Sequence, residues 1–249
     1  MMSEVSHYIE LARQAKVTDE VKQLAIACMD YTTLSDDDNK ASVVQLCQNA
    51  KKASVAAVCI YPQFVALAKA ELQSSDIAVA TVTNFPAGND TLSDVLILTE
   101  QALTDGADEI DLVIPYQSYQ AGDKQAAVEY VSASKALCGD RVLKVILETG
   151  ALSLETIADM SRDCIAVGAD FLKTSTGKIA QGASLEAVAT MLLAIRDLNS
   201  SVGCKVSGGI RSAQAVAEYI ELVSAIMGKD WVTPERFRIG ASSLLANLG

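Results

Sequence analysis

Four charged residues interrupt apolar runs that otherwise predict buried strands: Asp111, Lys144, Lys173 and Lys205. A charge in the middle of a buried strand is unfavourable unless it is paired or used. An isolated pair would favour a structural salt bridge, but three lysines against one carboxylate leave an excess of positive charge. Burial and repulsion between ammonium groups lower the pKa of a lysine, and a neutral amine is a nucleophile. The pattern therefore predicts attack on a carbonyl and a Schiff base.

The order of the strands favours Lys173 as the nucleophile. If sequential strands are neighbours, Lys173 lies between Lys144 and Lys205 and is repelled by both. Strand register read from a sequence is uncertain by a residue or two, so Lys205 remains a competing nucleophile.

The acid–base chemistry must come from lysine, acidic residues, tyrosine or cysteine, because His7 is the only histidine of the chain. A Ser-His-Asp or Cys-His nucleophile and a zinc site with several histidines are therefore hard to build. The six cysteines are scattered, with no C-x-x-C pair, and we interpret them as core residues in a reducing compartment. We expect neither a metal nor an organic cofactor.

Composition narrows the class of protein. Half of the 249 residues are hydrophobic but only 5% are aromatic, which favours an α/β core of Ala, Val, Ile and Leu. The formal net charge of −11 argues against a nucleic-acid partner. No stretch of about 18 apolar residues occurs, and charges run through the N-terminal segment. We therefore expect a cytoplasmic protein with no signal peptide, membrane span or membrane partner.

Short apolar, β-branched runs recur along the chain and alternate with segments of helical periodicity, such as 92–104 and 185–198. Strands separated by helices predict a parallel sheet, and eight such strands predict a closed (β/α)8 TIM barrel. We expect one domain over residues 1–249, with an extra N-terminal helix over 1–20 and the barrel over 21–249. The predicted strands are Ala25–Asp30, Val55–Tyr61, Ile77–Asn84, Glu109–Pro115, Val142–Glu148, Asp170–Ser175, Gly203–Gly208 and Phe237–Gly240.

A Gly-Ala-Asp tripeptide precedes the fourth and the sixth predicted strand, at residues 106–108 and 168–170. Each follows a helical stretch, where glycine is suited to end a helix. The pair predicts a repeated joint between helix and strand.

Glycine-bearing segments after the seventh and eighth predicted strands suit an anion. Ser207–Arg211 leads into a helix and Gly240–Ser243 opens the last one, so both offer backbone N–H groups at a helix amino terminus. The loops after these strands are the usual phosphate site of a TIM barrel. Thr174–Lys178, after the sixth strand, adds hydroxyls and an ammonium. Gly-Gly alone is more often a plain turn, but two such segments at these strands favour phosphate binding.

Six segments in the same order resemble the strand motifs of the deoxyribose-phosphate aldolase family, and the resemblance runs from Gln23 to Leu248. They are Met29–Leu34, Val58–Pro62, Thr81–Pro86, Gly106–Asp111, Leu143–Gly150 and Asp170–Lys178. The resemblance implies a lyase, a class I aldolase on a TIM barrel. Such an enzyme would reversibly cleave 2-deoxy-D-ribose 5-phosphate to glyceraldehyde 3-phosphate and acetaldehyde, in the catabolism of deoxyribonucleotides and carbohydrates.

The resemblance also implies roles for individual residues by position. Lys173 would form the Schiff base, Lys205 would lower its pKa and Asp111 would relay protons. The supporting relay or pocket residues would be Asp30, Lys144, Cys59 and Thr174. The residues around the phosphate would be Gly177, Lys178, Gly208, Gly209, Arg211, Gly240, Ser242 and Ser243.

Two features depart from the family pattern. Many relatives have Pro-Ala where this chain has Val206-Ser207, which we expect to alter the local backbone while keeping Lys205 and both glycines. The sequence ends at Gly249, without the longer tail ending in tyrosine that some relatives use in proton transfer. We therefore expect proton exchange to depend more on Asp111 and water.

Other interpretations stay open. Another phosphosugar barrel enzyme, such as a transaldolase-like class I aldolase or an isomerase, would share the fold. A catalytically silent phosphosugar-binding barrel would use the same anion loops, but it would have no reason to bury Asp111, Lys173 and Lys205. The expected partners are small molecules, and a homodimer would be compatible with the sequence.

Overall fold

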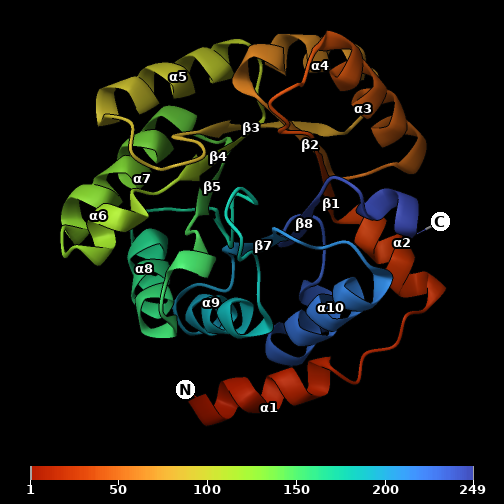
Figure 1. The fold of residues 1–249 in the computed structure, drawn as a ribbon, viewed down its shortest axis with the longest axis vertical. Helices are drawn as coiled ribbons and strands as arrows, with labels where there is room; N and C mark the ends of the chain where they lie inside the picture. Colours follow the sequence, from red (N-terminus) through yellow and green to blue (C-terminus); the bar gives the residue numbers. More distant parts are fainter. Residues whose placement is uncertain (1, 249) are drawn as a thin grey trace.

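The computed structural model describes residues 2–248. In it, eight parallel strands pair in chain order, and β8 pairs with β1 to close the barrel (Figure 1). The (β/α)8 barrel expected from the alternating pattern is therefore confirmed. The strands are β1 (Met29–Thr32), β2 (Ala57–Ile60), β3 (Ala78–Thr83), β4 (Glu109–Val113), β5 (Val142–Ile146), β6 (Phe171–Lys173), β7 (Gly203–Ser207) and β8 (Phe237–Ala241).

Helices connect the strands and form an outer ring around the barrel (Figure 1). Two of them, α5 and α9, coincide with the helical segments predicted at 92–104 and 185–198. The α-helices are α1 (Met2–Ala12), α2 (Asp19–Ala27), α3 (Lys40–Ala53), α4 (Val65–Leu72), α5 (Leu92–Thr104), α6 (Tyr116–Gln120), α7 (Lys124–Cys138), α8 (Leu154–Ala166), α9 (Leu185–Leu198) and α10 (Ala213–Met227). Short 3-10 helices lie at Pro62–Phe64, Thr149–Ala151, Lys229–Trp231 and Leu244–Asn247.

The N-terminal segment folds differently from the prediction. The extra helix expected over residues 1–20 is present but shorter, as α1, and after a break α2 begins, whose N-cap Thr18 accepts a hydrogen bond from the backbone N–H of Val21. The apolar run Ala25–Ala27, predicted as the start of the first strand, belongs to α2. A short apolar run fits a buried helix as well as a strand, and here the cap at Thr18 decides for the helix. Helix α1 packs outside α9 and α10 (Figure 1).

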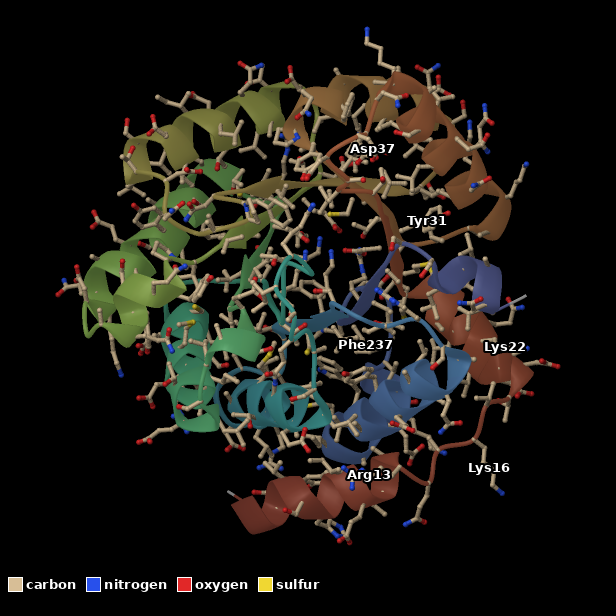
Figure 2. The ribbon with its side chains drawn as sticks, in the orientation of Figure 1. Arg13, Lys16, Lys22, Tyr31, Asp37 and Phe237 are labelled. Atoms are coloured by element: carbon tan, nitrogen blue, oxygen red, sulfur yellow. The ribbon has the colours of Figure 1, made fainter. Side chains whose placement is uncertain are left out.

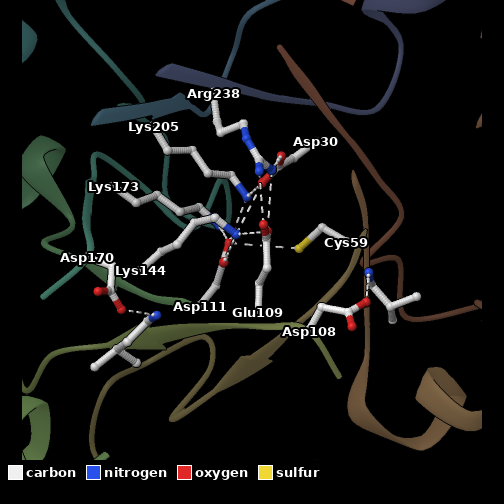
Figure 3. Close-up of polar contacts among 12 residues, drawn as sticks. Asp30, Cys59, Asp108, Glu109, Asp111, Lys144, Asp170, Lys173, Lys205 and Arg238 are labelled. Atoms are coloured by element: carbon white, nitrogen blue, oxygen red, sulfur yellow. Dashed lines mark hydrogen bonds and ion pairs between the residues drawn. The ribbon is translucent and has the colours of Figure 1, made fainter. Parts of the chain in front are cut away.

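The repeated Gly-Ala-Asp joint fixes the starts of two strands. In both copies the glycine adopts a positive φ as the preceding helix ends. The aspartate then accepts a hydrogen bond from the backbone of the preceding strand, Asp108 from Val79 at 2.8 Å and Asp170 from Leu143 at 2.8 Å (Figure 3). Because these bonds tie neighbouring strands together, they help to fix the register that positions the charged residues.

The main apolar core lies between the strands and the surrounding helices. Figure 2 shows Phe237 of β8 inside the molecule, whereas Arg13, Lys16 and Lys22 point away from it. Among residues 2–248, no helix combines the length and the apolar character needed to cross a membrane.

Candidate active site

Neighbouring strands place three cations side by side. Lys173 of β6 pairs in register with Lys205 of β7, and Lys205 pairs with Arg238 of β8. Adjacent like charges repel one another, so this arrangement requires nearby carboxylates. They come from β1 and β4, and a lysine of β5 completes what we call the ionic cluster (Figure 3). Its members are Asp30, Glu109, Asp111, Lys144, Lys173, Lys205 and Arg238.

Lys173 reaches the cluster through a single carboxylate oxygen. Its Nζ lies 2.7 Å from Oδ2 of Asp111, and the residue is only 3% exposed. Burial lowers the pKa of Lys173, and the ammonium of Lys205 lowers it further, while Asp111 acts in the opposite direction. The net effect is a lowered pKa, which favours the neutral, nucleophilic amine.

Lys205 is held between two carboxylates. Its Nζ lies 2.7 Å from Oδ2 of Asp111 and 2.5 Å from Oδ2 of Asp30. Burial by itself would lower the pKa of Lys205, but Asp111 and Asp30 outweigh burial and raise it. Lys205 therefore keeps its proton, and of the two competing lysines the geometry favours Lys173 as the amine that loses one.

Lys144 contacts more carboxylates than Lys173 or Lys205 does. Its Nζ donates to Glu109 and, at 3.1 Å, to Oδ1 of Asp111. Burial would lower the pKa of Lys144, but Asp111 and Glu109 raise it above the usual value. In register Lys144 faces Phe171, whereas Lys205 faces Lys173. Of the two lysines expected to repel Lys173, Lys205 is the one that lowers its pKa.

Two members of the ionic cluster, Glu109 and Arg238, were missed in the sequence. Nη1 of Arg238 lies 2.7 Å from Oδ1 of Asp30, and Nη2 lies 2.9 Å from Oε1 of Glu109. The expected ratio of three lysines to one carboxylate is therefore wrong, since Asp30 and Glu109 join Asp111. Both signals were present: Arg238 interrupts an apolar strand, and Glu109 precedes Asp111 by two residues, on the same face of the strand.

A pocket of about 360 Å³ opens beside Lys173, bounded by the segments that follow β1, β6, β7 and β8. These are the carboxyl ends of the strands, where TIM-barrel enzymes hold their substrates. The pocket also contains the segment Thr32–Ser35, which was not predicted as part of it. All of the residues predicted around a phosphate line the pocket: Gly177, Lys178, Gly208, Gly209, Arg211, Gly240, Ser242 and Ser243.

Glycines let the loops of this pocket pack tightly. Gly177, Gly208 and Gly209 have φ values of 78°, 88° and 84°, a region that disfavours side chains. A Cβ atom on Gly182 would lie 2.2 Å from the carbonyl oxygen of Gly208, so the loop after β6 rests directly on the loop after β7. Lys178 of the same loop also reaches Oδ1 of Asp36 at 3.3 Å. The loops after β6 and β7 thus line the pocket with exposed backbone groups, and Lys178 adds a positive charge beside them.

Of the two α-helices predicted to begin at the pocket, only the one after β7 is present in the described part of the chain. The segment Ser207–Arg211 does lead into a helix, α10, whose N-cap is Ser212. Gly240–Ser243 is followed only by the 3-10 helix Leu244–Asn247, so no α-helix opens there in residues 2–248. An anion at Ser242 would therefore be bound by local donors, without a long helix dipole behind it.

Cys59 and Thr174 lie next to the ionic cluster and outside the lining of this pocket. Sγ of Cys59 is 3.9 Å from Oδ2 of Asp111, and burial raises the pKa of the thiol. Cys59 packs with Ala80 and Val82 in a small apolar cluster. The hydroxyl of Thr174 donates to the carbonyl oxygen of Ser207 at 3.0 Å and so links the ends of β6 and β7.

Glu148, at the end of β5, is a further buried acid that sequence reasoning missed. It has a left-handed φ of 56°, and its carboxylate accepts hydrogen bonds from the hydroxyl and the backbone N–H of Thr176. Burial raises the pKa of Glu148, although the bonds from Thr176 act against burial. Its partner lies 28 residues away in the chain, so only the folded structure reveals the contact.

The chain matches the family model of DeoC/LacD family aldolases over residues 24–248. It is 27% identical to a candidate deoxyribose-phosphate aldolase from Coccidioides immitis, with a TM-score of 0.83, covering 99% of this chain and 96% of that one. A candidate deoxyribose-phosphate aldolase from Toxoplasma gondii is 25% identical, with a TM-score of 0.86, covering 92% of this chain and 93% of that one.

A third similar structure shares the fold at lower identity. Deoxyribose phosphate aldolase from Aeropyrum pernix is 23% identical, with a TM-score of 0.78, over 97% of this chain and 95% of that one.

Proposed function

Because the chain belongs to the DeoC/LacD family of aldolases, we propose that it reversibly cleaves 2-deoxy-D-ribose 5-phosphate to glyceraldehyde 3-phosphate and acetaldehyde. It is a lyase of the class I aldolase type. The observation that carries the proposal is the position of Lys173, 2.7 Å from Asp111, at a pocket lined mainly by glycines, hydroxyl-bearing side chains and two further cations. A lowered lysine pKa beside such a pocket suits an amine that attacks the carbonyl of a phosphorylated sugar.

The first step joins the enzyme to the substrate. The Lys173 amine adds to the aldehyde carbon, and loss of water gives an iminium ion that withdraws electrons from the adjacent carbon. Lys205, whose pKa is raised by Asp111 and Asp30 against the effect of burial, stays charged beside it. A fixed ammonium there disfavours protonation of the Lys173 amine.

The second step breaks the carbon–carbon bond. A water molecule polarised by Asp111 and Lys205 takes the proton of the 3-hydroxyl group. The bond between the second and third carbons then breaks, its electron pair forms the enamine, and glyceraldehyde 3-phosphate leaves. Protonation of the enamine followed by hydrolysis releases acetaldehyde and regenerates the amine. Asp30 and Lys144 support the relay by holding Lys205 and Asp111 in place.

The phosphate of the substrate would bind at the loops after β6, β7 and β8. Lys178 and Arg211 supply positive charge in a chain whose net charge is −11, and Ser242 and Ser243 supply hydroxyl donors. The glycines leave the backbone accessible to an anion. We propose that this end of the pocket selects phosphorylated over unphosphorylated sugars.

Product analysis tests the proposed reaction. Incubation with 2-deoxy-D-ribose 5-phosphate should yield acetaldehyde and glyceraldehyde 3-phosphate in equal amounts, and Lys173→Leu should yield neither. A wild-type protein that binds the phosphosugar but releases no acetaldehyde would be a silent binding barrel. Cleavage restricted to a keto sugar phosphate would indicate a transaldolase-like enzyme instead. Either result would contradict the proposal.

We propose that the reaction takes place in a reducing, cytoplasmic compartment. All six cysteines are buried free thiols, which supports a reducing, cytoplasmic location. The reaction would serve the catabolism of deoxyribonucleotides. The homodimer stays a prediction, which the molar mass in solution tests.

A further inference from the structure

Arg238 enters the ionic cluster from the end of the barrel opposite to the candidate active site. It lines a second cavity, of about 670 Å³, formed with residues at the amino-terminal ends of β2 and β3. From there its guanidinium binds Asp30 at 2.7 Å and Glu109 at 2.9 Å, and its Nε donates to the carbonyl oxygen of Pro234. The proposed reaction, on which the following inference rests, involves no contact between Arg238 and the substrate.

We infer that Arg238 is a positioning residue for the Schiff-base reaction: it engages Asp30 and Glu109, leaves the lysines one carboxylate short, and so keeps Lys173 uncharged. The ionic cluster holds more basic groups than acidic ones. The ionic cluster contains four basic groups, the three lysines and Arg238, against three carboxylates, so full ionisation would leave one positive charge in excess. A buried cluster with a net charge is unfavourable, and loss of one proton removes the excess.

The contacts select which group gives up that proton. Arginine keeps its proton in proteins, so the positive charge of Arg238 always balances the charge of one carboxylate. Lys144 lies within 3.5 Å of three carboxylates and Lys205 lies close to two. Lys173 has one, Asp111, and must share its Oδ2 with Lys205. Lys173 is therefore the least compensated cation, and the excess charge is removed there.

The remaining ionisable groups around the cluster do not alter the count. Strand β3 carries no ionisable residue. Burial raises the pKa of the Cys59 thiol on β2 and of the Cys28 thiol before β1, which keeps both neutral. Two acids lie at the periphery: Glu148 beyond Lys173, bound to Thr176, and Glu235 near Arg238. Neither forms an ion pair with a member of the cluster in residues 2–248.

The count of charges predicts that two substitutions shift the pKa of Lys173 in opposite directions. Arg238→Met leaves three lysines against three carboxylates, so all three lysines can be charged and Lys173 should hold its proton to higher pH. Glu109→Gln leaves four basic groups against two carboxylates, so Lys173 should lose its proton at lower pH. The double variant has three basic groups and two carboxylates, which restores the excess of one. If Arg238 served only in packing, these two substitutions would not shift the pKa of Lys173 in opposite directions.

The experiment measures the ionisation of Lys173 without turnover. Trace labelling with acetic anhydride over a range of pH, followed by mass analysis of the Lys173 peptide, reports the fraction of free amine. Arg238→Met should reduce labelling near neutral pH by about tenfold or more, which corresponds to a shift of at least one pH unit. Glu109→Gln should shift the profile the other way, the double variant should return toward wild type, and Arg238→Lys should stay close to it.

The outcomes separate this inference from the proposed function. Labelling needs no substrate, so a wild-type protein that forms no imine contradicts the proposed function without deciding the role of Arg238. Circular dichroism checks that each variant is folded. If Arg238→Met does not fold, Glu109→Gln still tests the charge count by its opposite sign. An unchanged profile in either folded variant, or shifts of both in the same direction, would overturn the inference.

Discussion

Lys173 and Lys205 are paired across β6 and β7, and their two Nζ atoms lie 2.7 Å from the same oxygen, Oδ2 of Asp111. Two cations that share one acceptor cannot both be fully compensated. Lys205 has a second carboxylate in Asp30, whereas Lys173 has Asp111 alone. The asymmetry explains why two neighbouring lysines on equivalent strands have pKa values shifted in opposite directions.

Replacing Lys205 should impair imine formation near neutral pH, although Lys205 is not the nucleophile. Burial lowers the pKa of Lys173 and Lys205 lowers it further, so Lys205→Leu should raise it and reduce the fraction of free amine. We expect imine trapping at neutral pH to fall by about tenfold or more, with recovery at alkaline pH. Aldol cleavage should recover only in part, because Lys205 also polarises the water of the relay. An unshifted trapping profile would show that Lys205 serves the relay alone.

Asp111→Asn should separate imine formation from cleavage. Asp111 acts to raise the pKa of Lys173, so its neutralisation should leave trapping intact or move it to lower pH. Cleavage should fall by about 100-fold or more, because the proton relay is lost. Asp159→Asn is a matched control, since Asp159 also binds a lysine, Lys124, but lies at the surface and outside the ionic cluster. Equal losses of trapping and cleavage in Asp111→Asn would argue against a relay role.

Ser242→Ala should raise KM for 2-deoxy-D-ribose 5-phosphate and leave the cleavage of unphosphorylated 2-deoxyribose nearly unchanged. The hydroxyl is one of the pocket groups assigned to the phosphate, and no step of the proposed cleavage uses it. Loss of a hydrogen bond to a charged group is worth about 1.5–3 kcal/mol. Steady-state kinetics with both substrates measure the difference. Similar losses for the two sugars would place the phosphate elsewhere.

The free energy of unfolding should decrease as the pH falls below about 4. Burial would raise the pKa values of Asp30 and Asp111, but the lysines of the ionic cluster outweigh burial and lower both. The unfolded chain therefore takes up these protons at higher pH than the folded protein does. Their stabilisation is present above the unfolded pKa and is lost as the pH falls toward the folded pKa. Urea unfolding at several pH values tests this, and Asp30→Asn should weaken the dependence.

The barrel could be predicted from the sequence because its strands are nearly continuous apolar runs. Helices α5 and α9 were placed correctly, since helical periodicity is clear over thirteen or more residues. The first strand was misplaced because Ala25–Ala27 is apolar and too short to show any period. The break between α1 and α2 was missed because both segments are polar and charged.

The candidate site could be predicted in outline from charges in the middle of strands. Lys173, Lys205 and Asp111 were found in this way, and the structure brings them within hydrogen-bonding distance. Their balance could not be predicted, because it depends on which carboxylate each lysine reaches across the barrel. Glu109 and Arg238 contact each other although they are 129 residues apart in the chain, and their contact changes the count of charges.

The most direct test of the central claim is chemical trapping of the nucleophile. Borohydride reduction in the presence of acetaldehyde, followed by mass analysis of the peptides, should locate a two-carbon adduct on Lys173. Lys173→Leu should abolish the adduct, whereas Lys69→Leu, at a half-exposed lysine that pairs with Asp108, should leave it unchanged. An adduct on Lys205 in the wild-type protein, or none on any lysine, would contradict the account.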